Sequence, residues 1–113
     1  MEELKQKLRE FADARDWDQF HSPKNLAMAM SVEASELLEH FQWLTQEESK
    51  QLNDEKFEAV KQEIGDVLLY LIRLSDKLGI NPVEAANEKI KLNEEKYPAE
   101  CVKGSSKKYT EYK

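Results

Sequence analysis

The sequence predicts an all-α protein, a bundle of four main helices assembled as a homo-oligomer. Glycine and proline number only three each in 113 residues, so few residues interrupt helices. Apolar residues recur at steps of three and four, which is the period of an amphipathic helix. A chain this short buries only roughly 65% of its unfolded surface, so association with copies of itself is a natural way to complete its core.

Capping signals place the first two helices. The first is expected over residues 2–15, and an aromatic-rich segment from Asp16 to Ser22 breaks its pattern. Ser22 and Pro23 then open a second helix that is expected to run to about Trp43. Serine caps exposed N–H groups, and proline suits the first helical position because its missing donor has no partner there.

Two further helices follow. The third main helix is expected over residues 54–78, with Asp54 as its cap and Gly79 as its end, since glycine tolerates the left-handed conformation after a helix. A fourth opens at Asn81-Pro82 and ends near residue 96. The predicted core stripe of the third helix consists of Val60, Ile64, Val67, Leu71, Leu74 and Leu78.

The remaining segments are expected to be short connections and a tail. Thr45 with Glu48 three residues later resembles a capping box for a short helical turn between the second and third helices. Residues 99–113 show no periodicity and carry several lysines, so we expect a flexible basic tail after a domain of residues 1–98.

Composition excludes several function classes. A net charge of −6 disfavours a basic nucleic-acid-binding face. The longest apolar run, residues 67–72, is far short of the ~20 residues that span a bilayer, and no secretory signal pattern is present. Cys101 is the only cysteine, which rules out an internal disulfide and suits a reducing cytoplasm. We therefore expect a cytoplasmic protein without nucleic-acid or membrane partners.

Acidic residues interrupt the apolar stripes of the two long helices. Glu33 stands where the stripe of the second helix would continue, and Glu36 lies one turn further on. Glu63 and Asp66 repeat this arrangement on the third helix. Antiparallel packing of the two helices would bring all four carboxylates into one oxygen-only site, which suits Mg²⁺ or Mn²⁺. Because Mg²⁺ is usually bound by a few carboxylates plus substrate phosphates, the pattern indicates a phosphorylated substrate.

Other interpretations of these acids remain open. They could form a solvated helix face, or a non-catalytic helical module could use them to bind the basic surface of a partner. A carboxylate-bridged di-iron bundle is disfavoured, because that pattern requires Glu-x-x-His and His40 follows Glu36 by four residues.

Several motifs in chain order resemble those of the MazG-like all-α nucleotide pyrophosphohydrolases, above all the dCTP pyrophosphatase branch of that family. The motifs are RDWDQFHSPKNL at residues 15–26, VEASEL at 32–37, FQW at 41–43, EIGDVLLYL at 63–71, Lys89-x-x-x-Asn93-x-x-x-Tyr97-Pro98, Lys103-Gly104-Ser105 and Lys108-Tyr109. The resemblance covers nearly the whole chain, and the ordered set is more specific than any single motif.

The resemblance implies an activity and a metal site. The family hydrolyses nucleoside triphosphates between the α and β phosphates with Mg²⁺, and its members are commonly dimers of dimers with sites shared between subunits. It implies that Glu33, Glu36, Glu63 and Asp66 are metal ligands, while Glu36 and Glu39 are both candidates for the general base. Dimeric or tetrameric assembly and a role in cleansing the nucleotide pool are expected.

The resemblance also implies which residues bind the substrate. Trp17 and Trp43 would stack on the nucleobase, and His21 and Tyr70 would add hydrogen bonds or packing. The residues that would reach the rest of the nucleotide are Lys89, Asn93, Lys103 and Lys108.

The sequence departs from the patterns of the family at two positions, and these positions bear on which branch of the family it resembles. Leu8 stands where eukaryotic dCTP pyrophosphatases carry a histidine, so the choice among dCTP and other pyrimidine substrates stays open. Val32 precedes Glu33 where many MazG-like proteins have a second acid, which favours the dCTP-type branch. A family member that binds nucleotides without turnover is a further alternative.

Overall fold

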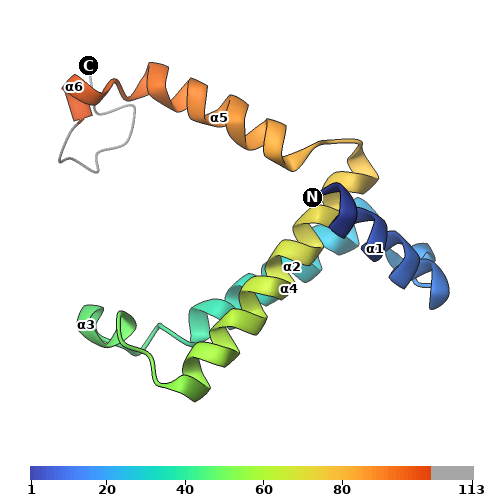
Figure 1. Ribbon diagram of the computed structural model, residues 1–113, viewed down its shortest axis with the longest axis horizontal. Helices are drawn as coiled ribbons and strands as arrows, with labels where there is room; N and C mark the ends of the chain where they lie inside the picture. Colours follow the sequence, from blue (N-terminus) through green and yellow to red (C-terminus); the bar gives the residue numbers. More distant parts are fainter. Residues whose placement is uncertain (103–113) are drawn as a thin grey trace. The chain divides into compact units, whose positions relative to one another are not determined.

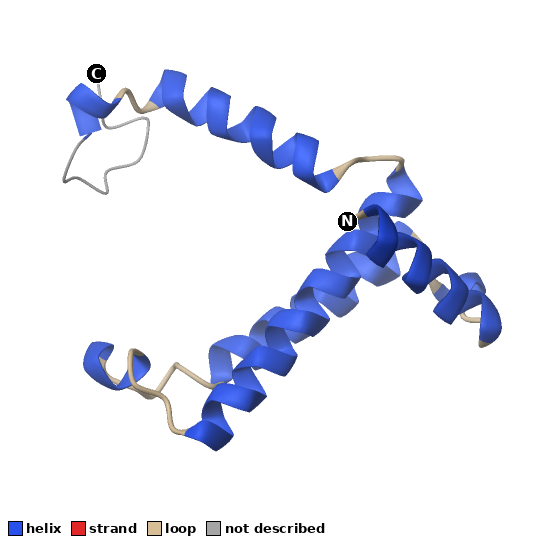
Figure 2. Ribbon diagram, viewed as in Figure 1, coloured by secondary structure: helices blue, strands red, loops and turns tan. Residues whose placement is uncertain are grey.

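The computed structural model describes residues 1–102, and within that range the chain is all-helical with no strand (Figure 2). This confirms the predicted all-α class, whereas assembly as a homo-oligomer stays a prediction. None of the helices described there has the length and apolar character needed to cross a bilayer. The elements are α1 (Glu2–Ala14), the 3-10 turn η1 (Asp18–Phe20), α2 (Pro23–Glu39), α3 (Gln46–Ser49), α4 (Asp54–Leu78), α5 (Pro82–Lys96) and α6 (Ala99–Val102).

Side-chain caps fix where the helices begin. The Ser22 hydroxyl accepts the backbone N–H of Asn25 and so caps α2, as predicted. The predicted capping box of Thr45 and Glu48 is present at α3. The N-cap of α4 is Asn53 and not Asp54, since the Asn53 amide oxygen accepts a first-turn N–H at 2.8 Å. Each cap satisfies a donor that the helix leaves unpaired.

The second helix is shorter than predicted. It ends at Glu39, and residues 40–43 form turns in place of the helical extension to Trp43. The backbone N–H of His40 bonds to the carbonyl of Leu37, and that of Phe41 to Leu38, so the helix tightens to bonds between residues three apart and then unwinds. The chain changes direction here and reaches Thr45, the N-cap of α3, whose backbone is extended.

The two long helices, α2 and α4, lie side by side and run antiparallel (Figure 1). The α1 helix packs against α4. Leu26 on α2 is 1% exposed, and the buried apolar core is completed by Ala12, Val60 and Ile72. The antiparallel pairing is the arrangement that the acidic pattern required.

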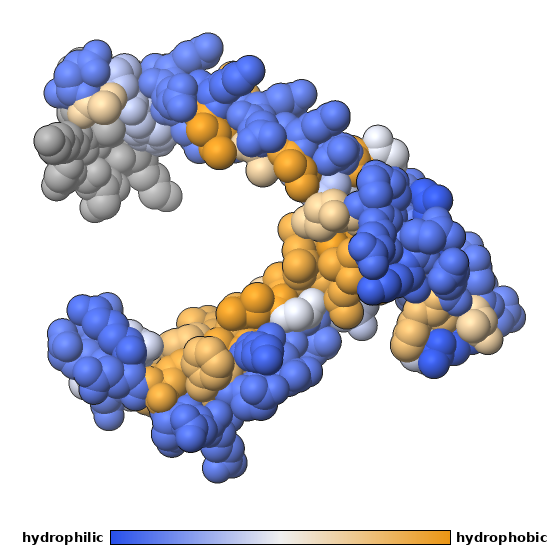
Figure 3. Space-filling view, viewed as in Figure 1, coloured by the Kyte–Doolittle hydropathy of each residue, from blue (hydrophilic) through white to orange (hydrophobic). Residues whose placement is uncertain are grey.

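The predicted core stripe of α4 is divided in the single chain. Val60 is buried and Val67 and Leu74 are half-buried, but Ile64, Leu71 and Leu78 are exposed. The stripe is wider than the surface that α2 and α1 cover, so the expectation that all six residues form the core is wrong for one chain. Figure 3 shows apolar surface along the α2–α4 pair.

The chain divides into two compact units, one of residues 1–80 and one that begins at Asn81. The first unit contains α1 to α4, and α5 belongs to the second. Residues 99–102 form the short helix α6 in place of the expected loop. The domain boundary expected near residue 98 stays a prediction, and the rest of the proposed tail lies outside the described residues.

Candidate metal centre and adjoining cavity

Three acidic side chains from the two long helices converge in the first unit. Glu33 and Glu36 lie on one face of α2, because residues three apart are neighbours on a helix surface. Antiparallel α4 adds Glu63, and one carboxylate oxygen from each residue lies within 4.8 Å of the other two. All three side chains are half-buried. The structure therefore brings together three of the four acids that were predicted to bind a metal.

Two oxygen atoms in this cluster are buried without a partner. Oε2 of Glu33 and Oε2 of Glu63 accept no hydrogen bond within the described part of the chain. A buried carboxylate oxygen without a donor is costly, and a bound cation would satisfy it. The donor set consists of carboxylate oxygens alone, which fits a hard cation such as Mg²⁺ or Mn²⁺ and does not favour a soft one.

The carboxyl group of Glu33 is strongly perturbed. Burial, proton sharing with Glu63 and Glu36, and the negative charges of Glu36 and Asp66 raise its pKa to about 7. Without a cation, a proton therefore offsets part of the repulsion in the cluster near neutral pH. A divalent cation would take the place of this proton.

The fourth acid, Asp66, lies at the edge of the cluster. It is exposed and does not belong to the group of three, although its charge acts on Glu33. Glu39, the last residue of α2, is also exposed and lies outside the group. The roles of Asp66 as a ligand and of Glu36 or Glu39 as a general base stay predictions.

A cavity of about 260 Å³ adjoins Asp66. It lies between α1, the connection to α2, and α4, and its walls are largely apolar and aromatic. Phe11 and Trp17 meet edge to face with ring centroids 5.6 Å apart, and the Arg15 guanidinium lies 3.7 Å from the centre of the Phe11 ring. The lining residues are Leu8, Phe11, Ala12, Trp17, His21, Asp66, Leu69, Tyr70 and Arg73.

This cavity contains three of the residues predicted to bind the nucleobase, namely Trp17, His21 and Tyr70. Trp43 does not line it, and the side chain of Trp43 is 86% exposed in the turn after α2. Lys89 and Asn93 are exposed on α5 in the second unit. Their contribution to a site stays a prediction. Lys103 and Lys108, which were also predicted to bind substrate, lie outside the described residues.

Arg73 is the residue of this cavity that sequence reasoning missed. It is 6% exposed, and its guanidinium donates hydrogen bonds to Asp18 at 2.6 Å and to Nδ1 of His21 at 3.2 Å. The available signal was a lone arginine one turn after Tyr70 in an otherwise apolar stretch. Asp18 and His21 lie more than fifty residues away from it in sequence, so the pattern alone could not identify them as its partners.

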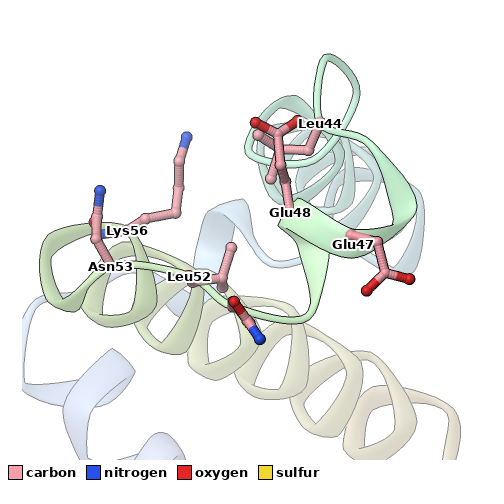
Figure 4. A pocket seen from close by; sticks show the side chains of 7 residues that line it. Leu44, Glu47, Glu48, Leu52, Asn53 and Lys56 are labelled. Carbon is pink, nitrogen blue, oxygen red and sulfur yellow. The ribbon is translucent and has the colours of Figure 1, made fainter.

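A second cavity, of about 340 Å³, lies where the α3 segment meets the start of α4 (Figure 4). The polar residues that line it form local contacts at the helix ends. Glu48 belongs to the capping box of α3, and Asn53 caps α4. Glu47 forms an ion pair with Lys50 at 3.5 Å. None of the predicted site residues lines this cavity. We therefore assign it to the local structure of the connection.

Fold and site together define an all-helical protein whose two long helices hold a cluster of carboxylates beside an aromatic cavity. The model of the MazG-like family matches residues 28–112, and the chain belongs to this family.

Relatives and a solved structure agree with this assignment. The chain is 38% identical to dCTP pyrophosphatase 1 of Homo sapiens, a match that covers 98% of this chain and 66% of the human protein. The protein of the same name from Bos taurus is 35% identical, with 98% and 67% covered. The chain thus spans about two thirds of the length of these relatives. A crystal structure of a pyrophosphatase from Archaeoglobus fulgidus is 48% identical, with a TM-score of 0.72 over 87% of this chain and 92% of that one.

Proposed function

We propose that this chain is a metal-dependent nucleotide pyrophosphohydrolase, which cleaves a nucleoside triphosphate to the monophosphate and pyrophosphate. The observation that carries the proposal is the convergence of Glu33, Glu36 and Glu63 with two buried, unpartnered oxygens. Membership of the MazG-like family and the names of the relatives support it. The expected role is removal of unwanted nucleotides from the cytoplasmic pool.

The acidic cluster would hold the cation. Glu33, Glu36 and Glu63 supply oxygen ligands, with Asp66 as the fourth, and Mg²⁺ or Mn²⁺ is the ion that this set fits best. When bound, the ion would neutralise phosphate oxygens and lower the pKa of a water molecule. The chain itself would supply the proton acceptor, for which Glu36 and Glu39 are the candidates. Hydrolysis by water needs no serine or cysteine nucleophile.

The aromatic cavity would hold the base. Trp17 and Tyr70 both line it, and stacking of a base on an aromatic side chain contributes about 1–3 kcal/mol. The name of the relatives, dCTP pyrophosphatase 1, favours a single-ring base in this cavity. Leu8, the position that departs from the eukaryotic pattern, lines this cavity. We therefore propose a pyrimidine substrate, with dCTP as the first candidate.

Self-association is part of the proposal. Phe57 and Ile64 on α4 are 60% and 54% exposed, and Met28 and Val32 on α2 are also exposed. Monomeric proteins rarely expose contiguous apolar surface of this kind. A dimer, or a tetramer built as a dimer of dimers, would cover it. The exposed Trp43 would then contribute to the site of a neighbouring subunit.

The test is pyrophosphate release by the full chain with each canonical nucleoside and deoxynucleoside triphosphate in the presence of Mg²⁺. We expect turnover of a pyrimidine deoxynucleotide, and we expect Glu63→Gln to lower kcat at least ~100-fold because it removes one ligand charge. Glu58→Gln is the matched control: it makes the same change on the same helix, at an exposed residue outside the cluster, and should leave turnover unchanged.

The alternatives give different results. A family member that only binds nucleotides would melt at a higher temperature with nucleotide and Mg²⁺, yet release no pyrophosphate. A helical interaction module would show neither effect. Either result would overturn the proposed activity.

A further inference from the structure

The aromatic cavity contains one buried cation, the guanidinium group of Arg73. An arginine that is 6% exposed is stable only if its N–H donors are paired. One terminal nitrogen of Arg73 donates to Oδ1 of Asp18 at 2.6 Å, and the other lies 3.7 Å from Oδ2 of Asp76. The third nitrogen of the group, Nε, donates its N–H to Nδ1 of His21 at 3.2 Å.

This last contact determines which nitrogen of His21 carries the proton. A nitrogen that accepts a hydrogen bond must be unprotonated, so the proton of the neutral ring is on Nε2. Within the part of the chain that the structure describes, Nε2 donates no hydrogen bond. His21 is half-buried and lines the cavity. Nε2–H is therefore the group that His21 can offer to a ligand.

The simultaneous hydrogen bonds to Asp18 and His21 depend on the planar, forked shape of the arginine side chain. Asp18 opens the η1 turn and His21 ends it, so the two partners lie three residues apart on one short element. Nε and one terminal nitrogen on the same edge of Arg73 reach both of them. A lysine presents a single point of charge and could not bond both in this geometry. Arg73 thus ties the orientation of the turn to α4.

We propose that Arg73 is a positioning residue that holds His21 in the Nε2–H tautomer, so that His21 donates a hydrogen bond to an acceptor atom of the nucleobase. The acceptor is a ring nitrogen or carbonyl oxygen. The identity of the ligand rests on the proposed function, whereas the tautomer of His21 does not.

The groups around His21 keep the ring neutral. Burial and the positive charges of Arg73 and Lys77 lower the pKa of His21, and the negative charge of Asp18 opposes them. Asp66 and Tyr70 face the same cavity. If Arg73 is removed, Asp18 loses this partner and the pKa of His21 should rise.

Nuclear magnetic resonance of the full chain tests the tautomer without any nucleotide. The sequence has two histidines, so ¹⁵N-resolved spectra of the imidazole rings can be assigned with a His40→Gln variant. We expect the Nε2–H form of His21 at pH 7.5 in the wild type, and mixed tautomers with a higher pKa in Arg73→Met. An Nδ1–H ring in the wild type, or an unchanged ring in Arg73→Met, would overturn the proposal.

Steady-state kinetics test its consequence. Arg73→Lys and Arg73→Met should raise KM for the nucleotide about tenfold, the effect of one misplaced hydrogen bond, with kcat changed less than about threefold. KM should also become dependent on pH between about 6 and 7, as expected for a histidine that titrates normally.

Arg9→Met is the matched control. Arg9 belongs to the same charge network, since it donates to Asp76 at 2.6 and 2.7 Å, but it does not line the cavity. An equal rise in KM in Arg9→Met would show a merely structural effect and refute the positioning role. If the wild type turns over no nucleotide, the proposed function fails, while the tautomer measurement still decides whether Arg73 positions His21.

Discussion

At the scale of single residues, Glu33 combines half-burial, an unpartnered oxygen and a pKa raised to about 7. Each of these three properties is unfavourable for folding, so we would not expect them together in a glutamate whose only role is structural. Sequence spacing identified Glu33 as a candidate metal ligand, because it stands at a position of the apolar stripe where an aliphatic side chain is expected. Arg73 could not be interpreted in the same way, since its function depends on partners that the fold brings from another element.

The raised pKa of Glu33 predicts how the metal-free protein responds to pH. Between pH 4.5, the ordinary value, and about pH 7, the folded state binds more protons than the unfolded state. The free energy of unfolding should therefore fall as the pH rises through this window. Glu33→Gln should remove this loss and stabilise the metal-free protein at pH 8 by about 1 kcal/mol.

Urea unfolding in the presence of a chelator, at pH 5.5 and pH 8, measures both free energies. Glu58→Gln serves as the control, because Glu58 is exposed and lies outside the cluster. A wild type that gains stability relative to Glu33→Gln between the two pH values would contradict the assignment.

At the scale of the helices, capping residues and apolar periodicity were enough to predict α1, α4 and α5 to within about one residue. Periodicity could not give the end of α2, because the residues after Glu39 are ordinary helix formers and the chain turns to enter the cap of α3. It also could not show that the α4 stripe has two sides. Val60 is buried in the unit in which α4 packs against α2, whereas Ile64 is 54% exposed within the described part of the chain.

The exposed side of α4 predicts self-association. Light scattering should give a mass of at least twice 13.2 kDa for the wild type. Ile64→Lys combined with Leu68→Lys should give a monomer, because both side chains are exposed and one turn apart. Gln62→Lys is the control on the same helix, at an exposed residue that is not apolar. A wild type with the mass of a single chain would refute this prediction.

At the scale of the whole molecule, the first unit places the acidic cluster and the aromatic cavity on the same helix, α4. Glu63 belongs to the cluster, while Asp66, Tyr70 and Arg73 face the cavity within the next three turns. If the proposed function is correct, one rigid element would therefore set the distance between the ion and the base of a nucleoside triphosphate. Sequence spacing predicted Glu63, Asp66 and Tyr70 in this order along α4 but not Arg73, and the antiparallel α2 supplies the other two acids of the cluster.

The central claim is that the carboxylates of Glu33, Glu36 and Glu63 bind a divalent cation. Anomalous diffraction from crystals of the full chain grown with MnCl₂ tests it most directly, because it locates the ion without relying on activity. We predict a manganese peak between α2 and α4 in contact with oxygens of all three residues. Manganese bound only elsewhere, with the three carboxylates free of metal, would contradict the account.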